Sequence, residues 1–159
     1  MMTPSTALSR RQAGFRGFTI IELMTVVVVM GTLVTLGYSR SKYIIDQGKV
    51  AKAIGDIRAL SVDVQGYAVA SPSQALPLTL TDIDRQGLLD PWGRPYVYVN
   101  LKLGGSPRTD AFGVNLNAEY DVYSLGPDGA SALSLTAGPS QDDVVLGGDG
   151  GFIGRASRY

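Results

Sequence analysis

The longest apolar stretch of the chain runs from Phe18 to Tyr38 and contains Glu22 as its single charged residue. A helix of that length reaches roughly 31 Å, about the thickness of the hydrocarbon core of a bilayer. Three arginines and no acidic residue precede Gly17, and this charge bias predicts that the amino terminus lies in the cytoplasm. We therefore expect residues 18–38 to form a transmembrane helix, with the rest of the chain in the periplasm or outside the cell.

A helical pattern continues past the apolar stretch. Apolar residues recur at i, i+3 and i+4 spacing between positions 44 and 67, while charged residues occupy the other faces. The pattern ends near Ser71-Pro72, because proline disfavours helix in the residue before it. We expect residues 39–71 to form an amphipathic helix that covers a small sheet.

Residues 72–159 alternate between turn-forming segments and short runs of strand-forming residues. A short helical turn is expected at 81–85, and Trp92 is expected to pack over the helix. The glycine-rich Gly147–Gly151 indicates a flexible linker. The expected strands are 96–101 and 119–125, which pair as an antiparallel hairpin with a long loop, and a third at 143–146 or 152–153.

Composition excludes several classes of function. The chain has 14 basic and 14 acidic residues, and without the three arginines that precede Gly17 the net charge would be −3. No basic patch that would favour nucleic acid then remains. The absence of Cys and His excludes disulfides, thiol catalysis, histidine bases and the usual zinc ligand sets. About 90 residues remain for a globular part, which is enough for one small core.

Two ordinary interpretations of the apolar stretch explain the sequence poorly. A secretory signal peptide would be shorter and would be followed by a small-residue cleavage site, which is missing. A simple single-span anchor leaves Glu22 unexplained. A carboxylate inside a membrane is costly, and it indicates a functional site.

The residues Gly17, Phe18, Thr19 and Glu22, in this basic-then-apolar context, resemble the processing signal of the type IV pilin superfamily. The resemblance implies that a prepilin peptidase removes residues 1–17 by cutting between Gly17 and Phe18, and that Phe18 becomes N-methylated. It also implies that Glu22 pairs with the amino-terminal amine of a neighbouring subunit during filament assembly. A carboxylate in a low dielectric must find a counter-charge or become neutral, which is consistent with a polymer.

Two further motifs, Asp90–Tyr96 (Asp-Pro-Trp-Gly-Arg-Pro-Tyr) and Tyr120–Gly129 (Tyr-Asp-Val-Tyr-Ser-Leu-Gly-Pro-Asp-Gly), resemble those of the major pseudopilins of the type II secretion system. The resemblance covers the whole domain order. It implies an α+β, pilin-like fold in which one long helix, transmembrane and then amphipathic, packs on a small antiparallel sheet with a metal-stabilised C-terminal loop. The expected domains are a removable leader 1–17, a transmembrane and assembly segment 18–38, and a periplasmic domain 39–159.

Most adhesive pilins close the C-terminal part with a disulfide, for which this chain has no Cys, so the resemblance implies that something else, expected to be a metal ion, fixes the loop. Calcium takes about six to eight oxygen ligands in irregular geometry, and this loop is rich in Asp. The resemblance implies a structural Ca²⁺ held by the Leu125 carbonyl and the carboxylates of Asp128, Asp142 and Asp143, although the interval between Asp128 and Asp142 is longer than in that family. Alternatively, Asp and Gly are simply turn formers here. The EF-hand pattern is absent.

The resemblance implies a non-enzymatic subunit that polymerises into a periplasmic fibre and drives protein export across the outer membrane. Before assembly it would be a single-pass inner-membrane protein. Its implied partners are further copies of itself, minor pseudopilins, the prepilin peptidase, the inner-membrane secretion platform and membrane lipid, but not nucleic acid. Three alternatives stay open: a surface type IV pilin for adhesion, motility or DNA uptake; a minor pseudopilin; and a tethered enzyme or binding module, with Asp82, Asp84 and Asp90 as candidate paired acids.

Overall fold

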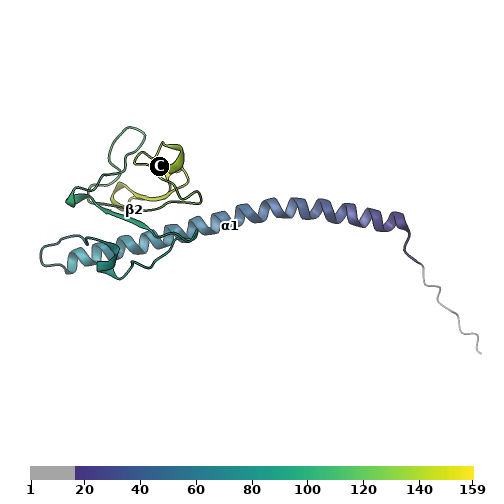
Figure 1. The fold of residues 1–159 in the computed structure, drawn as a ribbon, viewed down its shortest axis with the longest axis horizontal. Helices are drawn as coiled ribbons and strands as arrows, with labels where there is room; N and C mark the ends of the chain where they lie inside the picture. Colours follow the sequence, from purple (N-terminus) through teal and green to yellow (C-terminus); the bar gives the residue numbers. More distant parts are fainter. Residues whose placement is uncertain (1–16) are drawn as a thin grey trace, which may run out of the picture. The chain divides into compact units, whose positions relative to one another are not determined.

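The computed structural model describes residues 17–159, except for the side chains of residues 36–41. Residues 1–16 of the predicted leader lie outside the described part. The chain divides into two compact units, Met1–Lys42 and Tyr43–Tyr159. Helix α1, Ile20–Ala70, begins in the first unit and ends in the second (Figure 1). Its end at Ala70 agrees with the predicted stop at Ser71-Pro72.

In the first unit, the described part of α1 exposes its apolar side chains. Phe18 and Ile20 are 79% and 81% exposed, and Val34 is 70% exposed. Among the residues whose side chains are described, no helix is both long enough and apolar enough to cross a membrane. The predicted span 18–38 extends into residues 36–41, whose side chains are outside this set.

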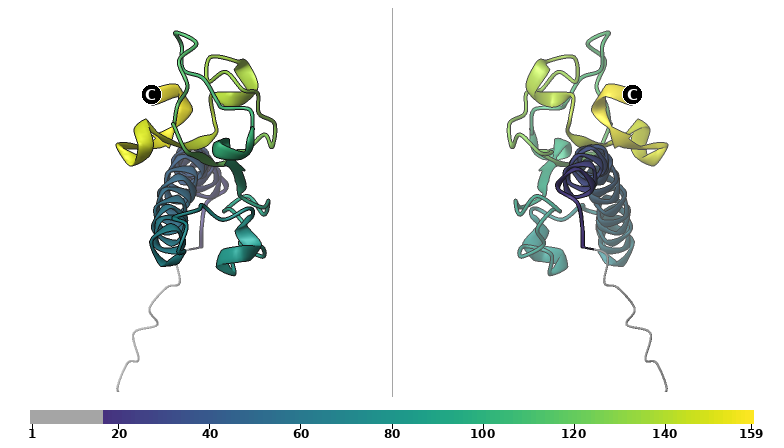
Figure 2. Two further views of the ribbon diagram at one scale, coloured as in Figure 1. Left: turned by 90° about the vertical axis from the view of Figure 1, so that its left-hand side faces the viewer. Right: turned by 90° about the vertical axis from the view of Figure 1, so that its right-hand side faces the viewer.

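In the second unit, α1 packs one face on an antiparallel sheet. The buried helix residues recur every three or four positions, as the amphipathic pattern predicts; they are Val50, Ala53, Ile57, Leu60 and Val64. They contact sheet residues that include Tyr120, Val122 and Val144. Trp92 is half-buried against the same core, which confirms its predicted packing. Figure 2 shows the sheet and its loops beside the C-terminal part of the helix.

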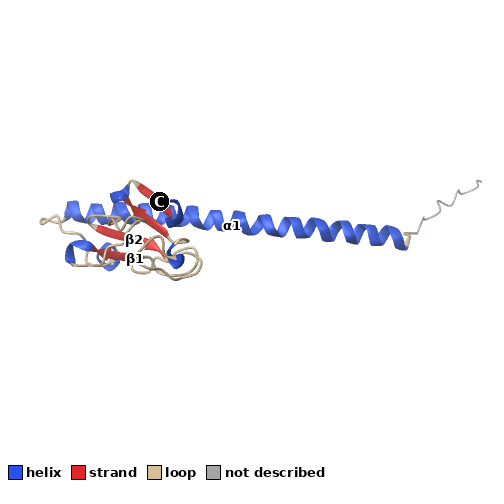
Figure 3. Cartoon of the chain, turned by 90° about the horizontal axis from the view of Figure 1, so that it is seen from above, coloured by secondary structure: helices blue, strands red, loops and turns tan. Residues whose placement is uncertain are grey.

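The sheet is a simple antiparallel meander in the order β1-β2-β3-β4 (Figure 3). Val97 pairs with Tyr123 and Asn100 with Tyr120, which confirms the predicted hairpin with a long loop. Both candidate positions for a third strand form strands. The strand bounds are β1 Val97–Asn100, β2 Tyr120–Ser124, β3 Val144–Gly147 and β4 Phe152–Arg155.

Short 3-10 helices punctuate the connections. The first, η1, confirms the helical turn expected near 81–85, and Thr79 caps it with its side chain. The 3-10 helices are η1 Leu80–Ile83, η2 Leu101–Leu103, η3 Gly138–Ser140, η4 Gly148–Gly150 and η5 Ala156–Arg158.

The sheet face that points away from α1 is also covered. The buried residues Leu116, Leu135, Val145 and Ala156 form a second core cluster, against which Tyr123 and other partly buried residues pack. The long β1–β2 and β2–β3 loops supply Leu116 and Leu135, so these loops act as a third layer. Strand β3 is buried along its whole length for this reason.

The glycine-rich segment Gly147–Gly151 is the tight connection between β3 and β4, so the expectation of a flexible linker is wrong. Gly148, Asp149 and Gly150 have φ of +58°, +51° and +100°, which glycine adopts readily and other residues seldom do. Asp149 accepts the Ala118 N–H at 2.8 Å. The segment is therefore tied to the neighbouring loop by hydrogen bonds.

Candidate functional sites

The predicted processing site lies in non-helical chain immediately before α1. Gly17 and Phe18 are exposed, and a Cβ placed on Gly17 would meet no atom within 4 Å. Helix α1 begins only at Ile20, so a protease need not unwind a helix to reach the Gly17–Phe18 bond. Cleavage there and methylation of Phe18 stay predictions.

Glu22 forms a capping box with Thr19 at the start of α1. The Thr19 hydroxyl accepts the Glu22 backbone N–H at 3.3 Å, and the Thr19 backbone N–H donates to Oε2 of Glu22 at 3.4 Å. These bonds satisfy N–H groups that a helix start leaves without partners, and the carboxylate lies at the positive end of the helix dipole. This second role of Glu22 could have been predicted from its Thr-x-x-Glu spacing.

The cap also sets the position of the Glu22 carboxylate relative to the predicted cleavage point. Its partner Thr19 directly follows Phe18, which would become the new amino terminus. Glu22 remains exposed in the single chain. The carboxylate is therefore fixed close to the predicted chain end while staying accessible to a second molecule.

The Asp-Pro-Trp-Gly motif is organised by Asp90, which is 4% exposed. Its Oδ1 accepts the backbone N–H groups of Trp92 at 3.0 Å and of Arg94 at 2.8 Å. Its Oδ2 accepts the hydroxyl of Ser124, at the end of β2, at 2.6 Å. Asp90 thus fixes the turn and joins it to the strand that leads into the C-terminal loop.

The long β1–β2 loop contains a second copy of this turn. Oδ1 of Asp110 accepts the N–H groups of Phe112 at 2.8 Å and Val114 at 2.9 Å, in the same pattern as Asp90. Gly113 has φ of +76°, and Gly93 in the first turn has φ of +88°. The shared Asp-x-aromatic-Gly spacing is the sequence signal that could have identified it.

The structure brings Asp128 and Asp142, two of the predicted calcium ligands, close together. The Asp128 N–H donates to Oδ2 of Asp142 at 3.2 Å. Burial raises the pKa of the Asp142 carboxyl, and the nearby Asp128 charge acts in the same direction. The Leu125 carbonyl, a third predicted ligand, accepts the Gly129 N–H at 3.2 Å within the turn.

Asp143, the fourth predicted ligand, is paired with an arginine that sequence reasoning missed. Arg108 and Asp143 are 2% and 0% exposed, and Nη2 of Arg108 lies 2.6 Å from Oδ2 of Asp143. Ser131 donates a further hydrogen bond to the same oxygen at 2.6 Å. Burial raises the pKa of the Asp143 carboxyl, whereas the Ser131 hydroxyl and the Arg108 guanidinium favour the ionised form.

Arg108 has additional partners that fix its position. Its backbone N–H donates to Asp121 at 2.9 Å, and its guanidinium lies 4.2 Å from the centre of the Tyr123 ring. Its position in the loop gave no sign that it would be buried, because arginine is rarely buried unless it is paired.

Three of the four predicted calcium ligands are acidic side chains, and the structure does not gather them around one point. Within the described part of the chain, no group of three or more acidic side chains is placed so that it could hold a metal ion. Oδ2 of Asp143 binds Arg108 and the Leu125 carbonyl accepts one hydrogen bond within a turn, whereas Oδ1 of Asp142 and Oδ1 of Asp143 are buried without a hydrogen-bond partner. Calcium binding itself stays a prediction.

Two of the three carboxylates considered as candidate paired acids, those of Asp82 and Asp90, accept backbone N–H groups. Asp82 accepts the N–H groups of Leu78 at 2.7 Å and Thr79 at 3.0 Å, and Asp84 ends η1 in a left-handed conformation. Asp90 binds the backbone N–H groups of its own turn. Asp82 and Asp84 line an open hollow of about 640 Å³ together with Asp63, which is paired with Arg85 at 2.8 Å, and Asp90 is not among the lining residues.

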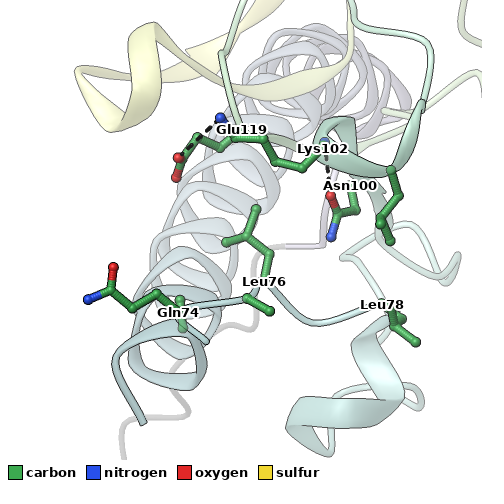
Figure 4. A pocket seen from close by; sticks show the side chains of 9 residues that line it. Gln74, Leu76, Leu78, Asn100, Lys102 and Glu119 are labelled. Atoms are coloured by element: carbon green, nitrogen blue, oxygen red, sulfur yellow. Dashed lines mark hydrogen bonds and ion pairs between the residues drawn. The ribbon is translucent and has the colours of Figure 1, made fainter. Parts of the chain in front are cut away.

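A pocket of about 350 Å³ lies between the end of α1, the connection after it and η2 (Figure 4). Leu76 and Leu78 are among its apolar lining residues. Three polar residues of its lining have partners: Lys102 and Glu119 form an ion pair of 3.6 Å, and Asn100 donates to the Pro77 carbonyl at 3.0 Å. The pocket offers no paired acids for hydrolysis.

Comparison of the sequence with known proteins finds several relatives, and those described here share the same name. The chain is 32% identical to type II secretion system core protein G of Pseudomonas aeruginosa, over 88% of this chain and 97% of the relative. It is 30% identical to the protein of the same name from Xanthomonas campestris, over 81% of this chain and 90% of the relative. The Escherichia coli protein of that name is 29% identical, over 72% and 83%. No family model matches the chain, and no solved structure matches it significantly.

Proposed function

The chain belongs to the type II secretion system core protein G family, and from this premise we propose how its residues support the function of a major pseudopilin. It is a major pseudopilin acting in type II secretion. Members of this family are structural pseudopilins rather than enzymes. The finer proposals concern processing, membrane insertion, assembly and partners.

The chain is processed between Gly17 and Phe18 by a prepilin peptidase, and Phe18 is then methylated. The exposure of both residues and the late start of α1 at Ile20 support this step. Before assembly, the apolar residues from Phe18 onward lie in the inner membrane, with the second unit in the periplasm. Their high exposure in the single chain supports a lipid or protein environment around them.

Assembly depends on Glu22. The observation that carries this proposal is that the capping box fixes the Glu22 carboxylate beside the predicted new amino terminus and leaves it exposed. In a low-dielectric bundle of apolar helices this charge needs a positive partner, and the amine of Phe18 from a neighbouring subunit supplies one. The product is a periplasmic fibre of many copies of this subunit, which minor pseudopilins join and which the inner-membrane platform builds.

Two measurements test the proposal. Mass spectrometry of the protein from native membranes should find residues 18–159 with one methyl group on Phe18, and an intact leader would contradict the processing step. Deletion of the gene should abolish exoprotein release and leave surface filaments unchanged. Loss of surface filaments with normal secretion would instead identify a surface type IV pilin.

A further inference from the structure

We propose that two arginines, Arg94 and Arg108, hold the β2–β3 loop, residues 125–143, in place of a divalent cation, and that the fold of this loop is independent of calcium. The proposal concerns the stability of the loop and does not rest on the proposed function. The predicted calcium ion would cross-link two kinds of oxygen, backbone carbonyls and carboxylates. The two guanidinium groups bind the same two kinds of oxygen.

Arg108 neutralises the carboxylate that is most deeply buried. A buried charge is costly unless a partner of opposite charge with good geometry compensates for it. Asp143 has that partner in the guanidinium of Arg108 at 2.6 Å, and both side chains are almost fully buried. Because Ser131 also binds the carboxylate, three segments of the chain meet at Asp143.

Arg94 binds the carbonyl side of the loop. Its guanidinium donates to the carbonyls of Gly126 and Pro127, the latter at 3.2 Å. The guanidinium also fills the space beside Gly129, where a Cβ would clash with it. Arg94 belongs to the turn that Asp90 fixes, so the loop is fastened to a rigid part of the fold.

The positive charge near Asp142 and Asp143 reduces the free energy that these carboxylates would gain by binding a divalent cation. Oδ1 of Asp142 and Oδ1 of Asp143 are buried without a hydrogen-bond partner, and these are the oxygens that a cation would approach. Asp143 already forms an ion pair of 2.6 Å with Arg108. A divalent ion at this place would stand close to a buried guanidinium, and like charges repel strongly where water is excluded.

The test is thermal melting of the full processed chain in detergent, in millimolar calcium chloride and in excess EGTA. We expect the same Tm in both. A Tm that rises with calcium and falls with EGTA would overturn the proposal. This comparison requires no variant, so it remains decisive even if the variants fail to fold.

Variants then separate the role of Arg108 from general damage. Arg108→Gln keeps hydrogen-bonding capacity but removes the charge, so its Tm should fall on the order of 10 °C. Calcium should raise the Tm of this variant, because Asp143 has lost its cation. Arg158→Gln, at an exposed arginine, is the control and should melt like the wild type. A wild-type Tm for Arg108→Gln, or a lowered Tm that calcium leaves unchanged, would overturn the proposal.

Discussion

The carboxylate of Asp90 accepts a hydrogen bond of 2.6 Å from the hydroxyl of Ser124. The two residues belong to separate motifs, Asp90–Tyr96 and Tyr120–Gly129, that are distant in the sequence. The same carboxylate shapes the first motif by binding the backbone of its turn. One buried side chain therefore joins the two motifs, which gives a physical reason for their presence together in one chain.

Replacement of Asp90 should be among the most damaging changes in the second unit. Asp90→Ala leaves two backbone N–H groups and the Ser124 hydroxyl without their acceptor in a buried place, which should cost about 3 kcal/mol of unfolding free energy. Thermal melting of the full chain in detergent measures it. The matched control is Asp110→Ala in the second, more exposed copy of the turn, for which we expect about 1 kcal/mol. Equal losses in the two variants would contradict this account.

Tyr96 should make the fold sensitive to alkaline pH. Burial raises the pKa of Tyr96, and the hydrogen bond of 2.9 Å that its hydroxyl donates to Asp56 acts in the same direction. Because the phenol ionises in the unfolded chain first, its contribution is complete below about pH 10 and is lost as the pH rises further.

The effect should appear as a slope in stability above pH 10. Tyr96→Phe should reduce that slope by about 1.4 kcal/mol per pH unit. It should also cost about 1 kcal/mol at neutral pH through the lost hydrogen bond. Denaturant unfolding across this pH range measures both, with the exposed Tyr43→Phe as control. An unchanged slope in Tyr96→Phe would show that Tyr96 is not the group responsible.

Gly126 should tolerate no side chain. Its φ is +63°, and a Cβ there would lie 2.5 Å from the Asp142 carbonyl oxygen. Gly126→Ala should therefore lower stability by about 2–4 kcal/mol, through both backbone strain and the forced separation of the two loop ends. Gly138→Ala is the matched control, because a Cβ at Gly138 meets nothing within 4 Å. Comparable Tm values for the two variants would contradict the described packing of the loop.

The elements of the fold could be predicted largely from local patterns. The end of α1 follows from Ser71-Pro72, and the hairpin of β1 and β2 from alternating Tyr and Val residues. The second core cluster could not be predicted in this way. Leu116 and Leu135 come from loops, where no period marks a buried face, so only the tertiary structure reveals that these loops cover the sheet.

Site residues could be predicted where a local sequence motif identifies them. They could not be predicted where their contacts depend on a residue distant in the sequence. Gly17, Phe18 and Glu22 follow from their spacing, and the structure adds the local cap with Thr19. The family resemblance implied that Asp143 binds a metal ion, and no sequence signal connects it with Arg108. The two residues lie 35 positions apart, and only folding brings their charges together.

The central claim is that Glu22 acts through its charge on a neighbouring subunit. The capping box makes a sharp test possible, since Gln can replace Glu in such a cap without carrying a charge. Glu22→Gln therefore keeps the start of α1 intact, whereas Glu22→Ala removes both the cap and the charge. Both variants should still lose residues 1–17.

The most direct measurement is the amount of exoprotein released by a deletion strain complemented with wild type, Glu22→Gln or Glu22→Ala at equal levels of processed protein. We expect the wild type to restore release, and both variants to reduce it at least about 10-fold, as the loss of a buried charge pair would. Full release with Glu22→Gln would contradict the account, because it would show that Glu22 only caps its own helix.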